Sequence, residues 1–203
     1  DSFFHFEIFG DNYHTEPIIG FAWGTEGQLY ASTDTGLLQT PIFKEFLEKT
    51  PLKVYDFKRA KVLLSHLGIT LQKPAFDSRL AKYLLSTVED NEISTIASLY
   101  SQIALPLDEV VYGKGAKKAI PEKTALLEHL ARKVAVLLDT EEPMMEQLQA
   151  HDQLDLLYDM EQPLAAVLAK MEIAGIKVER QTLEDMQVEN EVVLERLTQE
   201  IYE

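Results

Sequence analysis

The strongest constraint on the fold is a change of hydrophobic period along the chain. Short β-like runs fill the first third, at Phe3–Phe9, Ile18–Trp23 and Gln28–Ser32, and glycine-containing turns separate them. Two short connections favour an antiparallel meander of three strands. From Glu122 onward, apolar residues recur at spacings of three and four, which is typical of helices. The sequence therefore predicts an α/β fold of the mixed α+β type, with a sheet flanked by helices.

Shorter elements are expected between these two regions. They are a helix at Pro41–Glu48, a strand at Leu52–Tyr55, and helices at Asp56–His66, Asp77–Ser86 and Ile93–Ser101. The segment 105–121, with two prolines and two glycines, is predicted as a loop.

Three further expectations concern the helical part. Pro143 is expected to break or kink the helix that begins near Glu122. A second helix is expected to end at Gly175, and a last one to begin near Gln181. An apolar stripe marks the second helix: Leu157, Met160, Leu164, Val167 and Met171.

Composition excludes several classes of protein. The chain of 203 residues has no cysteine, which excludes disulfide scaffolds, zinc ribbons and thiol nucleophiles. No apolar run reaches the length of a membrane span. The 34 acidic and 19 basic residues give a net charge of −15, of which −12 falls on residues 141–203. Autonomous binding to nucleic acid is therefore disfavoured. Because the chain begins with Asp1 and not Met, a piece of a longer protein is expected.

Three acidic residues are candidates for a catalytic or metal-binding role. Glu7 lies inside the first predicted strand, where a carboxylate is a poor β-former, although a solvent-facing or edge position would also explain it. Asp56 and Asp77 each precede a helix, and the simpler interpretation of both is an N-cap.

Two other kinds of site find no support in the sequence. The segment Gly113–Lys118 lacks the spacing of a phosphate-binding loop. The five histidines do not occur at metal-ligand spacing.

Ordered motifs along the whole chain resemble the 3′–5′ exonuclease domain of bacterial DNA polymerase I, a family A polymerase, of the bacillus-like type. Phe4–Glu7 is similar to the first exonuclease motif, and Lys53–Arg59 to the second. Near the end, Met160–Leu164 and Gly175–Val178 resemble the entry to the polymerase domain. The resemblance implies an RNase H-like fold.

The resemblance also implies that the catalytic site is incomplete. Active members hold two metal ions on an Asp-x-Glu in the first motif, an Asp in the second and a Tyr-x-x-x-Asp on a later helix. In this chain Glu7 and Asp56 are present, but His5 replaces the first aspartate. Leu130 and Val134 stand at the tyrosine and the last aspartate. Hydrolysis is therefore expected to be lost, with Glu7 and Asp56 as remnants and no metal bound.

The function implied is that of a fragment of DNA polymerase I. Residues 1–158 would be a degenerate exonuclease domain with a structural role, and residues 159–203 the start of the polymerase domain. The fragment would need no cofactor, while Mg²⁺ would serve the polymerase domain of the parent. Expected partners are the rest of the polymerase chain and, through it, DNA. A monomer is expected, without a membrane, in the bacterial cytoplasm and at the nucleoid through the parent.

Two alternatives stay open. A residual metal-dependent 3′–5′ exonuclease would bind a divalent metal through Glu7 and Asp56, with His5 as a further ligand for a transition metal. A non-catalytic clamp for single-stranded DNA or a nucleotide would combine a basic island with an exposed aromatic side chain. The residues of that clamp would be Tyr112, Lys114, Lys117 and Lys118, with Lys123 completing the island.

Overall fold

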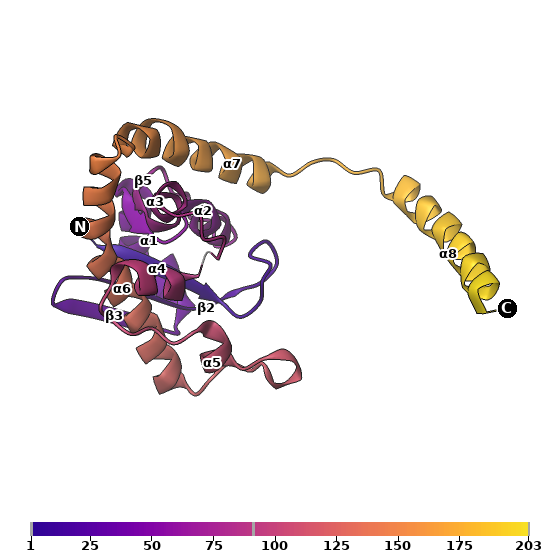
Figure 1. Cartoon of the computed structure of the whole chain (residues 1–203), viewed down its shortest axis with the longest axis horizontal. Coiled ribbons are helices and arrows are strands. Elements are labelled where there is room, and N and C mark those ends of the chain that lie inside the picture. The colour runs from indigo at the N-terminus through magenta and orange to yellow at the C-terminus, as the bar shows by residue number, and fades with distance from the viewer. Residues whose placement is uncertain (1, 91, 203) are drawn as a thin grey trace. The chain divides into compact units, whose positions relative to one another are not determined.

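The computed structural model describes residues 2–90 and 92–202. Its contacts define two compact units, Asp1–Ile173 and Ala174–Glu203. The first unit contains a sheet with helices packed on it, and the second contains the helix α8 (Figure 1). In the described part of the chain no helix is both long and apolar enough to cross a bilayer.

The order of elements confirms the mixed α/β fold. The strands are β1 (Phe3–Ile8), β2 (Ile18–Thr25), β3 (Gln28–Ser32), β4 (Leu52–Val54) and β5 (Pro74–Asp77). The helices are α1 (Pro41–Lys49), α2 (Phe57–Ser65), α3 (Ser78–Leu85), α4 (Ile93–Tyr100), α5 (Asp108–Tyr112), α6 (Lys123–Ala150), α7 (Gln162–Ala174) and α8 (Arg180–Tyr202), with short 3₁₀ turns η1 (Thr35–Gln39) and η2 (Gly115–Lys117) and a π-helical turn η3 (Leu156–Glu161).

The sheet has the order β3-β2-β1-β4-β5. The first three strands form the predicted antiparallel meander, whereas β4 lies parallel to both β1 and β5. β1 therefore lies at the centre of the sheet, and its side chains are buried on both faces. Because side chains alternate along a strand, Phe4, Phe6 and Ile8 join the core cluster that includes α1 and α2, and Phe3 joins the cluster that includes α6.

The helix α6 packs closely on the other face of the sheet (Figure 1). A Cβ atom added to Gly20 of β2 would lie 2.8 Å from Leu130 Cδ1 of α6. Such a distance is too short for two carbon atoms, so a larger residue would force the Leu130 side chain to shift, and glycine lets the helix approach the sheet without that shift. This close approach brings the middle of α6 next to β1.

Two expectations from the sequence are wrong in part. Pro143 does not break α6, which continues to Ala150, because Met144 and Leu148 beyond the proline are fully buried and hold the last turns on the core. The segment 105–121 is not only a loop, because it contains α5 and η2.

The apolar stripe of the second helix is buried only at its beginning. Leu157 is buried, but the other members of the stripe face solvent: Met160, Leu164, Val167 and Met171. The face of α7 that packs on the first unit contains Gln162, Ala165 and Ala169. The unit ends at Ile173, and the helix expected near Gln181 is α8, which begins at Arg180.

Candidate functional site

Glu7 is a buried carboxylate on the central strand. Its residue is 3 % exposed, so the solvent-facing and edge-strand interpretations of Glu7 are wrong. Alternation along β1 places His5 and Glu7 on the same face as Phe3, which is the face that α6 covers. A buried carboxylate needs a partner of opposite charge or several hydrogen bonds.

The partner of Glu7 is Lys133 of α6. The Lys133 Nζ donates to Glu7 Oε2 at 2.5 Å, and both side chains are buried. The His5 Nε2 lies 3.1 Å from the same oxygen and donates to it, since an ionised carboxylate only accepts. Burial opposes ionisation of Glu7, but the Lys133 ammonium outweighs it and holds the pKa of Glu7 well below its usual range. Burial lowers the pKa of His5, which keeps its ring neutral at pH 7.

Lys133 also ties α5 to the centre of the site. Its Nζ lies 2.9 Å from Asp108 Oδ1, at the first residue of α5. The Nε2 of His129, one turn before Lys133 on α6, is 2.8 Å from the same oxygen. Burial opposes the charge of Asp108, but these two contacts lower the pKa of the carboxyl. One ammonium thus joins two carboxylates from β1 and α5.

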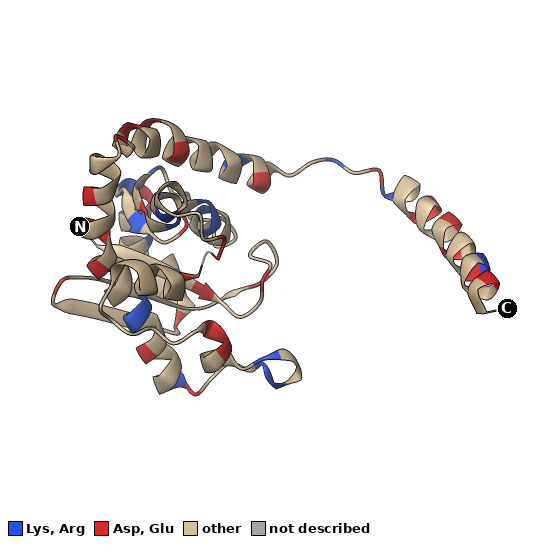
Figure 2. Ribbon diagram, viewed as in Figure 1, with Lys and Arg blue, Asp and Glu red and all other residues tan. Residues whose placement is uncertain are grey.

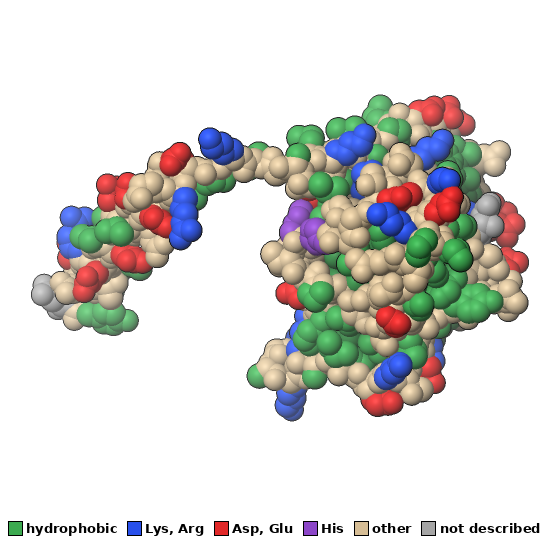
Figure 3. Space-filling model, turned by 180° about the vertical axis from the view of Figure 1, so that it is seen from behind, with side chains coloured by type: hydrophobic (Ala, Val, Ile, Leu, Met, Phe, Trp, Pro, Cys, Tyr) green, Lys and Arg blue, Asp and Glu red, His purple; other side chains and the backbone are tan. Residues whose placement is uncertain are grey.

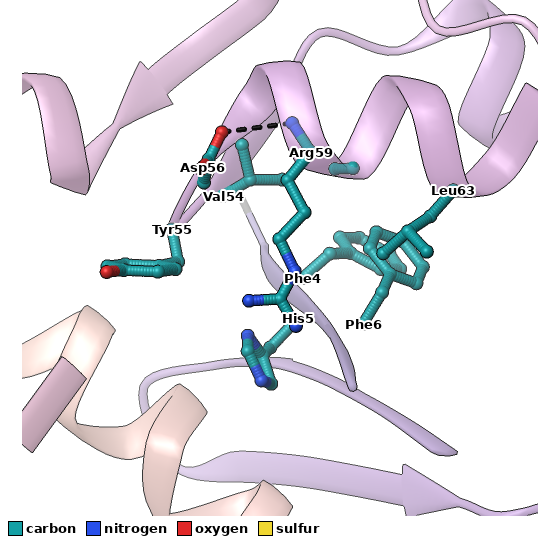
Figure 4. A pocket seen from close by; sticks show the side chains of 9 residues that line it. Phe4, His5, Phe6, Val54, Tyr55, Asp56, Arg59 and Leu63 are labelled. Carbon is teal, nitrogen blue, oxygen red and sulfur yellow. Dashed lines mark hydrogen bonds between the residues drawn. The ribbon is translucent and has the colours of Figure 1, made fainter. Parts of the chain in front are cut away.

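Asp56 is the N-cap of α2, as the simpler interpretation of the sequence predicts. Its Oδ1 accepts from the backbone N–H of Arg59 at 3.0 Å, and its Oδ2 forms an ion pair with Arg79 at 2.6 Å. The Arg59 side chain extends from the same turn toward His5 (Figure 4). It reaches to 4.0 Å from Glu7 Oε1 and adds a second cation near that carboxylate.

Asp77 is likewise confirmed as the N-cap of α3. Its Oδ1 accepts from Leu80 N at 3.0 Å, and its Oδ2 from Phe57 N at 2.7 Å. Its own backbone N–H donates to Gln162 Oε1 at 2.9 Å, which connects β5 to α7. Burial, together with the nearby charge of Asp56, raises the pKa of Asp77 to about 7. Asp77 therefore serves to connect elements of the fold.

Leu130 and Val134 are fully buried in the core cluster of α6. Both side chains pack against apolar neighbours, and neither offers an oxygen or nitrogen ligand. With His5 paired to Glu7, the positions expected to have lost metal ligands are occupied by a neutral ring and two apolar side chains.

The remaining donors do not fit a pair of divalent metal ions. Among residues 2–90 and 92–202, no group of three or more His, Asp or Glu residues is arranged to hold a metal ion. The two carboxylates expected to remain are both engaged, Glu7 with Lys133 and Asp56 with Arg79. A Mg²⁺ ion beside Glu7 would lie next to an ammonium and a guanidinium, and like charges repel.

A cleft of about 460 Å³ opens beside Glu7 and is lined by β1, the following turn, α5 and the loop after it. Lys114 and Lys118 line its rim, and the loop that contains them is marked by blue in Figure 2. Lys114 pairs with Glu109 at 2.9 Å, and Lys118 lies 3.8 Å from Asp11. Lys117 is in the same loop, in the short turn η2.

Tyr112 was expected to be an exposed aromatic, and this expectation is wrong. The residue is only 6 % exposed, and its ring lies edge-on to Phe9 and His129. A base cannot stack on a ring covered in this way. Burial, with the charges of Glu7 and Asp108, raises the pKa of Tyr112, so the phenol stays neutral.

Sequence reasoning missed the role of Lys133, Asp108 and His129. One signal was available, because Lys133 falls on the buried face of α6, three residues after Leu130 and four before Leu137. A lysine inside such a stripe requires a buried partner. The sequence could not identify that partner as Glu7, which is 126 residues away.

The sequence comparisons identify the family of this chain. Residues 4–140 match the family described as DNA polymerase I, ribonuclease H-like domain. The chain is 66 % identical over all 203 residues to the DNA polymerase I of Streptococcus pneumoniae R6, and covers 23 % of that protein. It is 40 % identical over 200 residues to the DNA polymerase I of Geobacillus stearothermophilus, with 97 % of the chain and 23 % of the relative covered. The chain thus spans about a quarter of the length of these relatives.

Solved structures share the fold at low sequence identity. The polymerase domain of Pol1 from M. smegmatis, in complex with a DNA primer-template and a dNTP, aligns with a TM-score of 0.73 at 22 % identity, over 93 % of this chain and 31 % of that one. NrnC from Brucella melitensis aligns with a TM-score of 0.70 at 15 % identity, over 86 % of this chain and 85 % of that one. The expected RNase H-like fold is confirmed. The family match over residues 4–140 and the high identity to several polymerases show that the chain belongs to the DNA polymerase I, ribonuclease H-like domain family.

Proposed function

We propose that this chain is the exonuclease-like part of a DNA polymerase I in which 3′–5′ hydrolysis has been lost and the domain acts as a structural support. The ion pair between Lys133 Nζ and Glu7 Oε2, at 2.5 Å, is the observation that carries this proposal. In an active two-metal site, divalent cations neutralise clustered carboxylates and activate water. Here an ammonium neutralises the carboxylate, but it can neither polarise a phosphodiester nor lower the pKa of a water molecule as a metal does.

The position of α5 supports the same proposal. Asp108 joins α5 to Lys133, and Tyr112 at the other end of α5 packs against Phe9 after β1. This segment therefore lines the cleft beside Glu7, at the place where a substrate would have to reach the remnant carboxylate. Lys133, which takes the place of the metal in this proposal, thus also holds α5 at the cleft beside Glu7.

Several properties follow for the parent protein. DNA-templated DNA synthesis, with Mg²⁺, belongs to the polymerase domain of the parent, and residues 159–203 are the start of that domain. The exonuclease-like domain itself requires no cofactor. It contacts DNA only through the parent, which works as a monomer in the cytoplasm and at the nucleoid.

Loss of hydrolysis can be tested with a 3′-end-labelled single-stranded oligonucleotide. We expect no digestion by the chain in Mg²⁺ or in Mn²⁺ beyond that seen with the E7Q/D56N variant, because the ligands for two metals are not present. The variant is matched in shape and shows any contaminating nuclease. Metal-dependent digestion by the original chain that is absent from the variant would show that Glu7 and Asp56 still form a working site.

A further inference from the structure

β3 is the last strand of the sheet on one side. A connection of two residues joins it to β2, and Thr25 pairs with Gln28 across that connection. Such a pair exchanges backbone hydrogen bonds, and the pairs along an antiparallel ladder alternate between bonded and non-bonded. The N–H and C=O groups of Leu29 and Ala31 therefore point away from β2, toward the free edge of the sheet.

The two edges of the sheet differ in how they are protected. At the opposite edge, β5 begins with Pro74, which has no N–H, and the N–H of Asp77 donates to Gln162 of α7. Proline and charged residues are usual means by which proteins keep an edge strand from pairing. The five residues of β3, Gln28–Ser32, include neither, and their register with β2 is unbroken. The edge of β3 is therefore open to a further strand.

Beside this edge, the aromatic core of the sheet reaches the surface. Tyr30 stacks on Trp23 of β2, with ring centroids 5.2 Å apart, and is 48 % exposed. Trp23 stacks in turn on Phe4 at 6.4 Å, and Phe4 lies 5.9 Å from Phe46 of α1, which is 43 % exposed. Ile42, one turn before Phe46, is 84 % exposed. Figure 3 shows hydrophobic side chains gathered at the surface of the first unit on the side turned away from the viewer in Figure 1, where α1 lies.

We call the free edge of β3, with the exposed side chains of Tyr30, Ile42 and Phe46, the β3 edge surface. Its charges are acidic, because Glu26 precedes β3, Asp34 follows it, and both are exposed. Residues 26–34 contain no basic side chain. Carboxylates at both ends of the strand repel a phosphate backbone but attract lysine or arginine, so protein and not nucleic acid is the suitable partner.

We propose that the β3 edge surface binds an extended segment of a partner protein, which joins the sheet as a further strand. Main-chain hydrogen bonds to Leu29 and Ala31 supply affinity, and the aromatic side chains contact the side chains of the segment. Because side chains alternate along a strand, the segment has apolar residues at every second position and a basic residue beside Glu26 or Asp34. β3 spans about 17 Å, which matches about five residues of the partner.

Random peptides displayed on phage are the probe for this surface, selected on the immobilised 203-residue chain. We expect the enriched peptides to have apolar residues at alternate positions and a flanking lysine or arginine. The most enriched peptide is then synthesised with a fluorescent label and titrated with the chain and its variants. Fluorescence anisotropy gives the Kd of each complex.

The Y30K and A31P variants are expected to raise the Kd at least about tenfold. Lysine at position 30 places a charge in the apolar surface. Proline at position 31 removes an N–H that faces the free edge and not β2, so the strand should still form, which circular dichroism verifies. The Y83K variant is the matched control, because Tyr83 is 64 % exposed on α3, which follows β5 at the other edge, and it should leave the Kd unchanged.

Methylation of the peptide's own backbone nitrogens tests strand addition without altering the chain. In an antiparallel ladder only every second residue of a strand donates to a given neighbour, so methylating one alternate set should abolish binding and methylating the other should have little effect.

Three results would overturn the proposal. The first is that no alternating peptide is enriched, or that the peptide binds the original chain, Y30K and A31P with the same Kd. The second is equal tolerance of methylation at every position of the peptide. The third is a dimer of the 203-residue chain in sedimentation velocity that A31P abolishes, because a second copy would then be the occupant. The exonuclease assay is independent of all three, since the β3 edge surface does not include Glu7 or Asp56.

Discussion

Replacing Lys133 with methionine is expected to lower the free energy of unfolding by about 3–5 kcal/mol at pH 7, because it leaves the buried Glu7 carboxylate without its cation. Methionine keeps the length of the side chain, so the loss reports on charge and not on a cavity. Urea denaturation followed by circular dichroism measures the difference. The K114M variant is the matched control, because Lys114 forms an exposed ion pair with Glu109, and it should cost at most about 1 kcal/mol.

The double variant K133M/E7Q separates the contribution of the Lys133–Glu7 ion pair to stability from the effect of each single substitution. We expect the second substitution to recover a substantial part of the stability, since a neutral amide costs less to bury than an unpaired carboxylate.

The pH dependence of stability follows from the same ion pair. Glu7 has a folded-state pKa below its unfolded value, so its contribution is present above that unfolded value and is lost as the pH falls below it. In K133M the ammonium is missing and burial alone acts on Glu7, which raises the pKa of that carboxyl, so the carboxylate takes up a proton and the deficit of K133M should shrink as the pH falls from 7 toward 4. Equal stability of K133M and the original chain at pH 7 would contradict the importance of the ion pair.

Restoring the missing aspartate is expected to damage the fold without restoring the site. The V134D variant should lose about 3–4 kcal/mol of stability, because Val134 is fully buried among apolar side chains and a carboxyl there would lack partners. Added Mg²⁺ should not recover this loss while Lys133 remains beside Glu7. Urea denaturation in Mg²⁺ and in a chelator measures both effects.

The V134T variant is the control for the change of polarity. Threonine keeps the shape of valine, and its hydroxyl can donate to a carbonyl of the preceding turn, so we expect a smaller loss than for V134D. Stabilisation of V134D by Mg²⁺, absent from V134T, would contradict the conclusion that the site no longer fits a metal.

The fold follows from the sequence where local signals and packing agree. The meander, the caps at Asp56 and Asp77 and the helix after Glu122 are predicted correctly, because turn residues, cap residues and period all act locally. Pro143 is a different case. Its local preference to end a helix is outweighed by the buried turns that follow it, and sequence alone does not contain that energy.

The candidate site could be predicted only in part, because its contacts join residues that lie far apart in the sequence. The resemblance predicts that His5, Leu130 and Val134 stand where active members have other site residues, but the sequence gives no role to Lys133. The ion pair with Glu7 depends on the close approach of α6 to β1, and the contact of Lys133 with Asp108 depends on α5, which the sequence analysis expected to be loop. The stripe of α7 shows a related limit, because periodicity reveals that a helix is amphipathic but not which partner covers it.

Binding of Mn²⁺ tests the replacement of the metal site by Lys133 most directly. Isothermal titration of the 203-residue chain and of its E7Q/D56N variant should give the same isotherm, since any weak binding by the acidic surface is common to both proteins. Circular dichroism would verify that the variant is folded. If the original chain instead shows a saturable Mn²⁺ site that the folded variant lacks, Glu7 and Asp56 still hold a metal and Lys133 has not taken its place.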